Sequence, residues 1–205
     1  MRIGILADIH EHVEHLELVL EAVRNENVDE LILLGDVAYD GRRIAEVVSL
    51  LRPFEPVGVW GNHDLGLAHR PSGEIIRKYG RSVVEFFTAF QPRIVREDHL
   101  FVHGLPTWDA SDPAAYYLGT PPWEADSLAY EFAHTDHRIV LTGHFHRWFL
   151  ATPRKTIPWQ GRTAISFAPS ERYLVIINPV FDGSFAILDT DANVLTPHSV
   201  VEDGA

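Results

Sequence analysis

Histidine is unusually frequent in this chain, with 12 copies among 205 residues, and several copies stand beside Asp, Asn or Gly. A histidine next to a carboxylate can supply metal ligands, or a proton donor and acceptor that work near neutral pH. Five short clusters of this kind each follow a run of apolar residues. They are Asp8-Ile9-His10, Gly35-Asp36, Gly61-Asn62-His63-Asp64, His103-Gly104 and Gly143-His144-Phe145-His146.

The clusters offer a mixed set of oxygen and nitrogen donors, and the chain has no cysteine. Such a set suits Mn²⁺, iron or Zn²⁺ better than Ca²⁺ or Cu⁺. The candidate ligands are too many for one tetrahedral ion. Two ions about 3.5–4 Å apart, with one carboxylate bridging them, would use them all. Such a pair holds a hydroxide as the nucleophile and clamps the attacking and leaving oxygens in a displacement at phosphorus.

Each cluster also has a plain structural explanation. Asp8 fits a helix N-cap, the Gly35 and Gly61 clusters fit turns, and His103 fits the end of a strand. The Gly143 cluster is a stronger signal, because alternate residues of an extended segment point the same way. The joint occurrence of all five, each after a predicted strand, outweighs these separate explanations.

The elements that must position these residues begin with an alternation of strands and helices. The apolar pattern predicts strands over Arg2–Ala7, Leu31–Leu34 and Pro56–Trp60, and helices over Val13–Asn25 and Arg42–Leu51. This order indicates a parallel sheet with right-handed crossovers. Ligands collect beyond the carboxyl ends of the strands in such sheets, so the clusters should converge on one edge.

The rest of the chain is predicted to be more varied. We expect a long helix over Ser72–Phe90, an irregular segment over Leu105–Pro122 and a helix over Trp123–His134. Further strands are expected at Arg93–Arg96, Leu100–His103, Arg138–Thr142, Trp148–Ala151, Thr163–Phe167, Tyr173–Ile177, Ser184–Leu188 and Val194–Val200. The stretches after Trp148 predict a second, more antiparallel sheet. We interpret residues 1–205 as one α/β domain.

Together the five clusters resemble the full motif set of the calcineurin-like metallophosphoesterases, and the chain's size resembles the small bacterial and archaeal branch of that superfamily. The resemblance implies a four-layer α/β/β/α sandwich with two mixed sheets. It also implies two divalent ions, with Mn²⁺ preferred and iron, Zn²⁺, Ni²⁺ or Co²⁺ as alternatives. The implied ligands are Asp8, His10 and His146 for the first ion, Asn62, His103 and His144 for the second, and Asp36 as the bridge.

The same resemblance implies two catalytic residues. His63 would approach the scissile phosphate and protonate the leaving group, and Asp64 would orient His63. General chemistry supports the first role, because a leaving alkoxide needs a proton. Two departures stand out: Asp64 replaces the Glu of the protein phosphatases, and Asn178-Pro179 is not followed by the Gly-Ser that is frequent in the small branch.

The expected function is hydrolysis of a phosphodiester or phosphomonoester in a small molecule or nucleotide, by a metal-bound hydroxide at a binuclear site. A protein or small-molecule phosphomonoesterase is the alternative enzyme, and a non-catalytic scaffold is the alternative from another class. The net charge of −12 disfavours a nucleic-acid partner. We see no targeting segment and no apolar run of about 18 residues, so we expect a cytoplasmic protein without a membrane partner.

The remaining candidates are single residues. The loop aromatics Trp108, Tyr116, Tyr117 and Trp123 fit packing better than a platform for a base, and Arg147 fits a phosphate contact or a solvated residue equally well. We expect the other histidines to lie near helix ends or at the surface. The helix-end group is His12, His15, His134 and His137, and the surface group is His69, His99 and His198.

Overall fold

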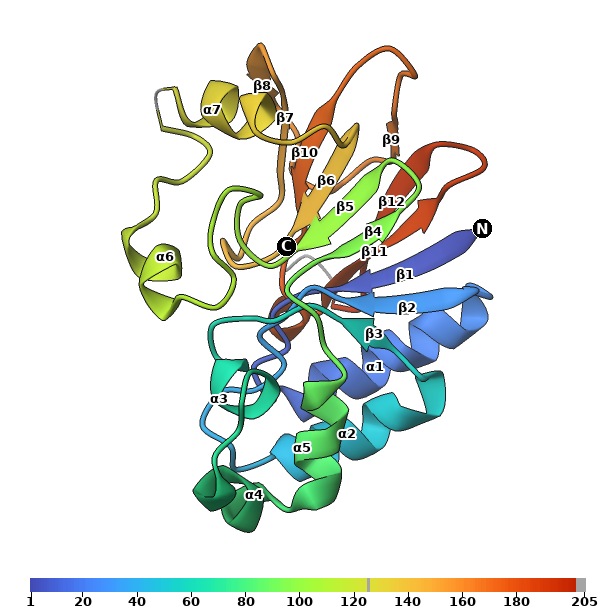
Figure 1. Ribbon diagram of the computed structural model, residues 1–205. Coiled ribbons are helices and arrows are strands. Elements are labelled where there is room, and N and C mark those ends of the chain that lie inside the picture. The colour runs from blue at the N-terminus through green and yellow to red at the C-terminus, as the bar shows by residue number, and fades with distance from the viewer. Residues whose placement is uncertain (125, 202–205) are drawn as a thin grey trace.

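The computed structural model describes residues 1–124 and 126–201. Two six-stranded mixed sheets pack face to face, and helices cover the outer face of each sheet (Figure 1). The four-layer sandwich implied by the sequence is therefore confirmed. In the described part of the chain, no helix is both long and apolar enough to cross a membrane.

The first sheet has the strand order β3-β2-β1-β11-β12-β9. Strands β1 to β3 are parallel, as predicted, and β11 joins β1 in the antiparallel direction. Helix α1 (Val13–Asn25) and helix α2 (Ile44–Leu51) cover this sheet. The strands are β1 (Arg2–Leu6), β2 (Glu30–Leu33), β3 (Val57–Gly58), β9 (Ile165–Ser166), β11 (Ser184–Asp189) and β12 (Val194–Ser199).

The second sheet has the strand order β4-β5-β6-β10-β7-β8. Its three central strands β5, β6 and β10 are parallel, and its outer pairs are antiparallel. The strands are β4 (Ile94–Arg96), β5 (His99–Val102), β6 (Ile139–Thr142), β7 (Phe149–Thr152), β8 (Lys155–Ile157) and β10 (Tyr173–Ile176).

The strands after Trp148 do not form a sheet of their own, so that prediction was wrong. Strands β9, β11 and β12 extend the first sheet, whereas β7, β8 and β10 complete the second. The five residues Ser184–Leu188 of β11 are all buried, which suits a strand between β1 and β12. Apolar periodicity reports burial and not the identity of the neighbouring strand, so it could not assign these partners.

Three apolar layers fill the sandwich. Leu16 of α1 and Phe87 pack on the outer face of the first sheet. Ile5 and Phe101 lie in the core between the sheets. Phe132 lies in the cluster on the outer face of the second sheet. The central layer holds the two sheets together and so brings their carboxyl ends to one side of the molecule.

The helix predicted over Ser72–Phe90 is divided in two at Gly80, whose φ of +84° a residue with a Cβ rarely adopts. The halves are α4 (Gly73–Tyr79) and α5 (Arg81–Thr88). The irregular segment after Leu105 contains one short helix, and the next helix is shorter than predicted. The remaining helices are α3 (Leu65–Ala68), α6 (Pro113–Leu118), α7 (Ser127–Ala133), and the 3₁₀ turns η1 (Arg52–Phe54) and η2 (Val180–Asp182).

Candidate metal centre

The predicted ligands come together just beyond the carboxyl ends of β1, β2, β5 and β6. Their ligand atoms fall into two groups, and within each group all atoms lie within 4.8 Å of one another. Asp36 belongs to both groups, as the bridging role requires. The first group is Asp8, His10, Asp36 and His146, and the second is Asp36, His103 and His144.

In the first group, two imidazole nitrogens and two carboxylates face a common point. His146 Nε2 lies 3.4 Å from Asp8 Oδ1. His10 Nε2 lies 3.2 Å from His146 Nε2 and 3.7 Å from Asp36 Oδ2. Two imidazole nitrogens and two carboxylates form the donor set that Mn²⁺, iron or Zn²⁺ accepts.

In the second group, His103 Nε2 lies 3.2 Å from Asp36 Oδ2 and 3.1 Å from Asn62 Oδ1. The other ring nitrogen of His103 is 2.6 Å from the Leu34 carbonyl, and His144 Nε2 is 3.0 Å from the Tyr116 carbonyl. Such bonds to backbone carbonyls fix the orientation of a metal-binding imidazole and leave its other nitrogen for the ion.

Buried charge is the observation that tests whether metals fit here. The carboxylates of Asp8 and Asp36 are at most 2 % exposed. Buried like charges are costly unless cations neutralise them. The excess of buried negative charge and the nitrogen and oxygen donors both fit divalent ions.

The burial and close spacing of these charged groups shift their pKa values. Burial disfavours the charged ring of His103, yet the charge of Asp36 raises its pKa to about 9. Burial opposes ionisation of Asp36, but His103 holds the pKa of Asp36 well below its usual range. Burial, with the charge of His103, lowers the pKa of His144 to about 4. Metal binding would displace the His103 proton, because a coordinating imidazole is neutral.

The backbone at the centre is strained. Five of the predicted ligands have a positive φ, which costs roughly 1–2 kcal/mol per residue with a side chain. Backbone hydrogen bonds sustain part of this geometry, for example from the Asp8 amide to the Gly35 carbonyl (3.1 Å). Strain of this kind clusters at functional sites. The five residues are Asp8 (+50°), His10 (+47°), Asp36 (+52°), His144 (+65°) and His146 (+51°).

The third cluster begins with a glycine, Gly61, because a residue with a side chain would not fit there. A Cβ atom at this position would collide with the backbone nitrogen and Oδ1 of Asp36. The loop after β3 therefore lies directly against Asp36. This contact lets the His63 amide donate a hydrogen bond to Asp36 Oδ1 at 2.9 Å.

The carboxylate of Asp64 is bonded to backbone amides of two loops. Its oxygens accept hydrogen bonds from the amides of Ala38 (2.9 Å) and Gly61 (3.2 Å). Within the described residues, neither oxygen bonds the ring of His63, which instead contacts the rings of His10 and Tyr39. Asp64 therefore ties together the loops after β2 and β3. Burial and the nearby Asp36 raise the pKa of Asp64 to about 7.

Three residues beside the metal ligands escaped the sequence analysis. Tyr39 and Phe181 help to line a cleft of about 380 Å³ at the centre. Glu11 is buried, and its carboxylate accepts hydrogen bonds from the amides of Tyr39, Gly41 and Arg43 at 2.7–2.9 Å. Only the position of Glu11 directly after the first cluster could have marked it, because no periodicity singles it out. The other lining residues of the cleft are His10, His12, His63 and His146.

The structure also places several of the single residues that the sequence analysis considered. His99 is 1 % exposed, so its assignment to the surface was wrong. Tyr116 is buried and packs on His103 and His144, as the packing interpretation expected. Arg147 lies over the ring of Trp123, with 4.8 Å between the guanidinium carbon and the ring centroid.

Comparison with known proteins shows which protein family the chain resembles. The family model of the calcineurin-like phosphoesterase superfamily domain matches residues 1–178. An uncharacterized protein of Methanocaldococcus jannaschii is 30% identical over 105 residues, which are 51% of this chain and 42% of that relative. The chain thus spans less than half the length of that relative.

Solved structures show the same fold. A metallophosphoesterase from Sphaerobacter thermophilus superposes with a TM-score of 0.77 and 25% identity, over 98% of this chain and 88% of that one. An archaeal phosphodiesterase gives a TM-score of 0.56 and 16% identity, over 97% of this chain and 99% of that one. The chain belongs to the calcineurin-like phosphoesterase superfamily, a family of metal-dependent hydrolases.

Proposed function

We propose that this protein is a phosphoesterase with two divalent metal ions, which hydrolyses phosphodiester or phosphomonoester bonds in small molecules or nucleotides. One observation carries the proposal: Asp36 lies within ligand distance of both groups of donors. A shared carboxylate between two donor groups is the arrangement that holds a metal pair.

The seven ligand side chains each have a role in this proposal. Asp8, His10 and His146 would hold one ion, and Asp36 would be shared. The second ion would be held by Asn62, His103 and His144. When bound, the ions would polarise the phosphoryl oxygens and lower the pKa of an attacking water.

His63 would donate a proton to the leaving oxygen. Its ring lies 4.9 Å, centroid to centroid, from that of His10, at the wall of the cleft. The bond from its amide to Asp36 fixes the backbone of His63 beside the bridging ligand. Asp64 supports this geometry by holding the adjoining loops together. Because an alkoxide is a poor leaving group, the proton matters most for alkyl esters.

The alternatives differ in what they require. A dedicated phosphomonoesterase would use the same centre and differ only in substrate preference. A non-catalytic scaffold has no need for a complete set of ligands. All seven predicted ligands are present, six of them in the two donor groups and Asn62 beside His103. This observation supports an enzyme over a scaffold.

The test is hydrolysis of bis(4-nitrophenyl) phosphate and 4-nitrophenyl phosphate, with added Mn²⁺ and with a chelator. We expect chelator-sensitive turnover and about two metal ions per chain by elemental analysis. Faster hydrolysis of the first ester would indicate a diesterase, and faster hydrolysis of the second would indicate a phosphatase. A protein that binds no metal and hydrolyses neither ester would contradict the proposal and favour the scaffold.

A further inference from the structure

A groove of about 730 Å³ begins at Arg147, the residue that follows the predicted metal ligand His146. Rings connect the groove to the metal centre. The ring centroids of Trp123 and Phe145 are 5.3 Å apart, and those of Phe145 and His144 are 5.0 Å apart. These contacts place the groove beside the predicted metal centre, with the ring of Phe145 between Trp123 and His144.

The lining of the groove combines flat rings with positive charge. It contains three of the five tryptophans in the chain, together with Phe149. Arg147 supplies positive charge, and no Asp or Glu occurs among the described lining residues. The whole chain has 29 acidic and 17 basic residues, so the positive charge of the groove contrasts with the negative net charge of the chain. The charge of Arg147 therefore favours an anion at its end of the groove.

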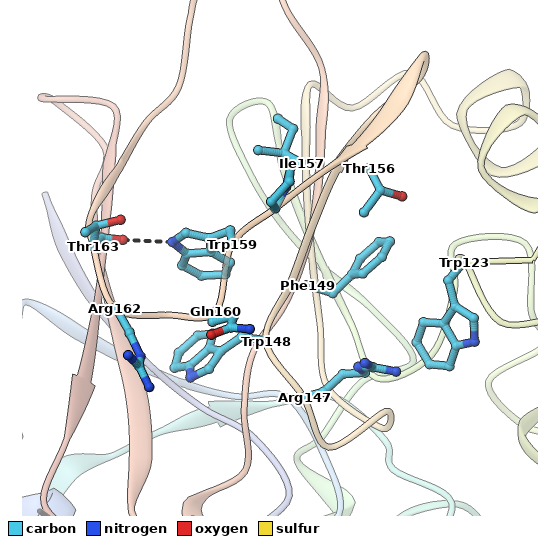
Figure 2. Close-up of a pocket in the computed structure, with 11 residues that line it drawn as sticks. Trp123, Arg147, Trp148, Phe149, Thr156, Ile157, Trp159, Gln160, Arg162 and Thr163 are labelled. Atoms are coloured by element: carbon cyan, nitrogen blue, oxygen red, sulfur yellow. Dashed lines mark hydrogen bonds between the residues drawn. The ribbon is translucent and has the colours of Figure 1, made fainter. Parts of the chain in front are cut away.

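Figure 2 shows how the rings are arranged. Trp123 lies on one side of the groove, Trp148 and Trp159 lie on the other, and Phe149 stands between them. Trp148 and Trp159 meet edge to face at 5.2 Å. The Trp159 Nε1 atom donates to the Thr163 carbonyl at 2.8 Å, which fixes the ring. Pre-positioned aromatic rings of this kind are platforms on which a planar base stacks.

Arg147 is exposed and placed to bind an anion. Its guanidinium carbon lies 4.8 Å from the centroid of Trp123, and stacking of this kind holds the guanidinium in place. A guanidinium has donors in a fixed fork, which matches two oxygens of a phosphate. Gln160 and Thr156 add neutral polar groups that a base edge or a sugar could use.

We propose that this groove binds the base and a non-reacting phosphate of a nucleotide, so that the substrate class is a nucleotide phosphoester. The assignment of the nucleotide as substrate rests on the proposed function. Binding of a nucleotide in the groove is a separate event and can be measured without turnover.

The first experiment is calorimetric titration of the metal-loaded protein with adenosine 5′-phosphate, and separately with inorganic phosphate, which can reach the metal centre and Arg147 but carries no base. We expect adenosine 5′-phosphate to bind more tightly than inorganic phosphate. Adenosine carries the ring without the charge, so it should bind about tenfold more weakly. If adenosine 5′-phosphate binds no more tightly than inorganic phosphate does in a parallel titration, the base makes no contact and the groove proposal is wrong.

Two variants locate the binding. Trp123→Leu removes a stacking ring that is 42 % exposed, and Arg147→Gln removes the fixed charge. Each should weaken binding of adenosine 5′-phosphate about tenfold. The matched controls are Tyr130→Leu, an exposed ring on α7 outside the groove, and Arg154→Gln, an exposed charge in the β7–β8 turn. Equal affinity in all four variants would overturn the proposal.

A kinetic comparison then connects binding to substrate. Thymidine 5′-(4-nitrophenyl phosphate) and bis(4-nitrophenyl) phosphate share a leaving group, and only the first carries a nucleoside. We expect a higher kcat/KM for the first, and a loss of that preference in Trp123→Leu, because the single phosphate of this ester is the reacting one and only its base would lie in the groove. Binding without hydrolysis of either ester would contradict the proposed function while leaving the groove intact. Hydrolysis of both esters at equal rates, with no nucleotide binding, would contradict the groove proposal and leave the proposed function intact.

Discussion

Tyr39 stacks on His63, with the ring centroids 5.6 Å apart and the planes inclined by 29°. The Tyr39 side chain is 62 % exposed, so its ring forms an outer wall beside His63. The loop under it is fixed, because the Tyr39 amide donates to Glu11 Oε1 at 2.9 Å. Tyr39 is therefore placed to position the ring that we propose as the proton donor.

Replacing Tyr39 should affect the proton-transfer step more than metal binding. We expect Tyr39→Ala to lower kcat about tenfold on an alkyl phosphoester and less on a 4-nitrophenyl ester, because the aryl leaving group needs less protonation. Tyr39→Phe keeps the ring and should stay close to the parent. Steady-state kinetics on both esters gives the comparison, and an equal loss on the two would show that Tyr39 acts in some other way.

His63→Gln tests the proton donor itself. The glutamine keeps the backbone amide that bonds Asp36, so we expect metal content to be unchanged. Turnover of alkyl phosphoesters should fall about 100-fold, with a smaller loss on aryl esters, because general acid catalysis contributes on that scale. Elemental analysis and kinetics on the same preparation measure both effects. Parental activity on alkyl esters would exclude the acid role.

The convergence of the five clusters could be predicted because each follows an apolar strand, and strand ends meet at one edge of a sheet. The assignment of single residues to each ion came only from the resemblance to the superfamily. Glu11 and Tyr39 could not be predicted in the same way. Glu11 acts through backbone amides of a distant loop, and Tyr39 acts through a ring contact, so neither leaves a periodic pattern. The hydrogen-bond partners of Asp64 could not be predicted for a similar reason, since they are the backbone amides of Ala38 and Gly61.

The fold shows the same division between local and non-local information. The helix over Val13–Asn25 and the parallel order of β1 to β3 follow from local apolar periodicity. The position of β11 between β1 and β12 depends on contacts across most of the chain. The positive φ of Asp8 and Asp36 also depends on such contacts, because the local sequence does not favour it over an ordinary turn.

Metal binding should stabilise the fold, because the buried carboxylates Asp8 and Asp36 then face cations. At a concentration one hundred times its Kd, Mn²⁺ would add about 2.7 kcal/mol per site to the free energy of unfolding. For a chain of this length, that corresponds to a rise in Tm of about 5–10 °C. Thermal melts with Mn²⁺ and with a chelator measure the difference.

Asp36→Asn should remove most of this stabilisation, because the shared ligand loses its charge. Asp40→Asn is the matched control, since Asp40 lies on the same loop and pairs with Arg42 at the surface. We expect the control to keep the full shift in Tm. A parental shift in Asp36→Asn would contradict the bridging assignment.

His99 should make stability depend on pH. It is buried in β5, and its Nε2 atom lacks a hydrogen-bond partner among the described residues. Burial lowers the pKa of His99 below its ordinary value near 6.5, although Asp98, 3.0 Å away, opposes the shift. The unfolded chain therefore takes up a proton at a higher pH than the folded chain does. The contribution of His99 is intact above about pH 6.5 and is lost as the pH falls toward the lowered pKa.

A non-titrating side chain at this position should flatten that dependence. We expect the free energy of unfolding of His99→Gln, from urea titrations in chelator, to fall less between about pH 7 and pH 5 than that of the parent. His134→Gln, an exposed histidine after α7, should follow the parent curve. Because other histidines titrate in the same range, the difference between variant and parent isolates His99. Parallel curves for His99→Gln and the parent would mean that burial does not hold its ring neutral in the folded protein.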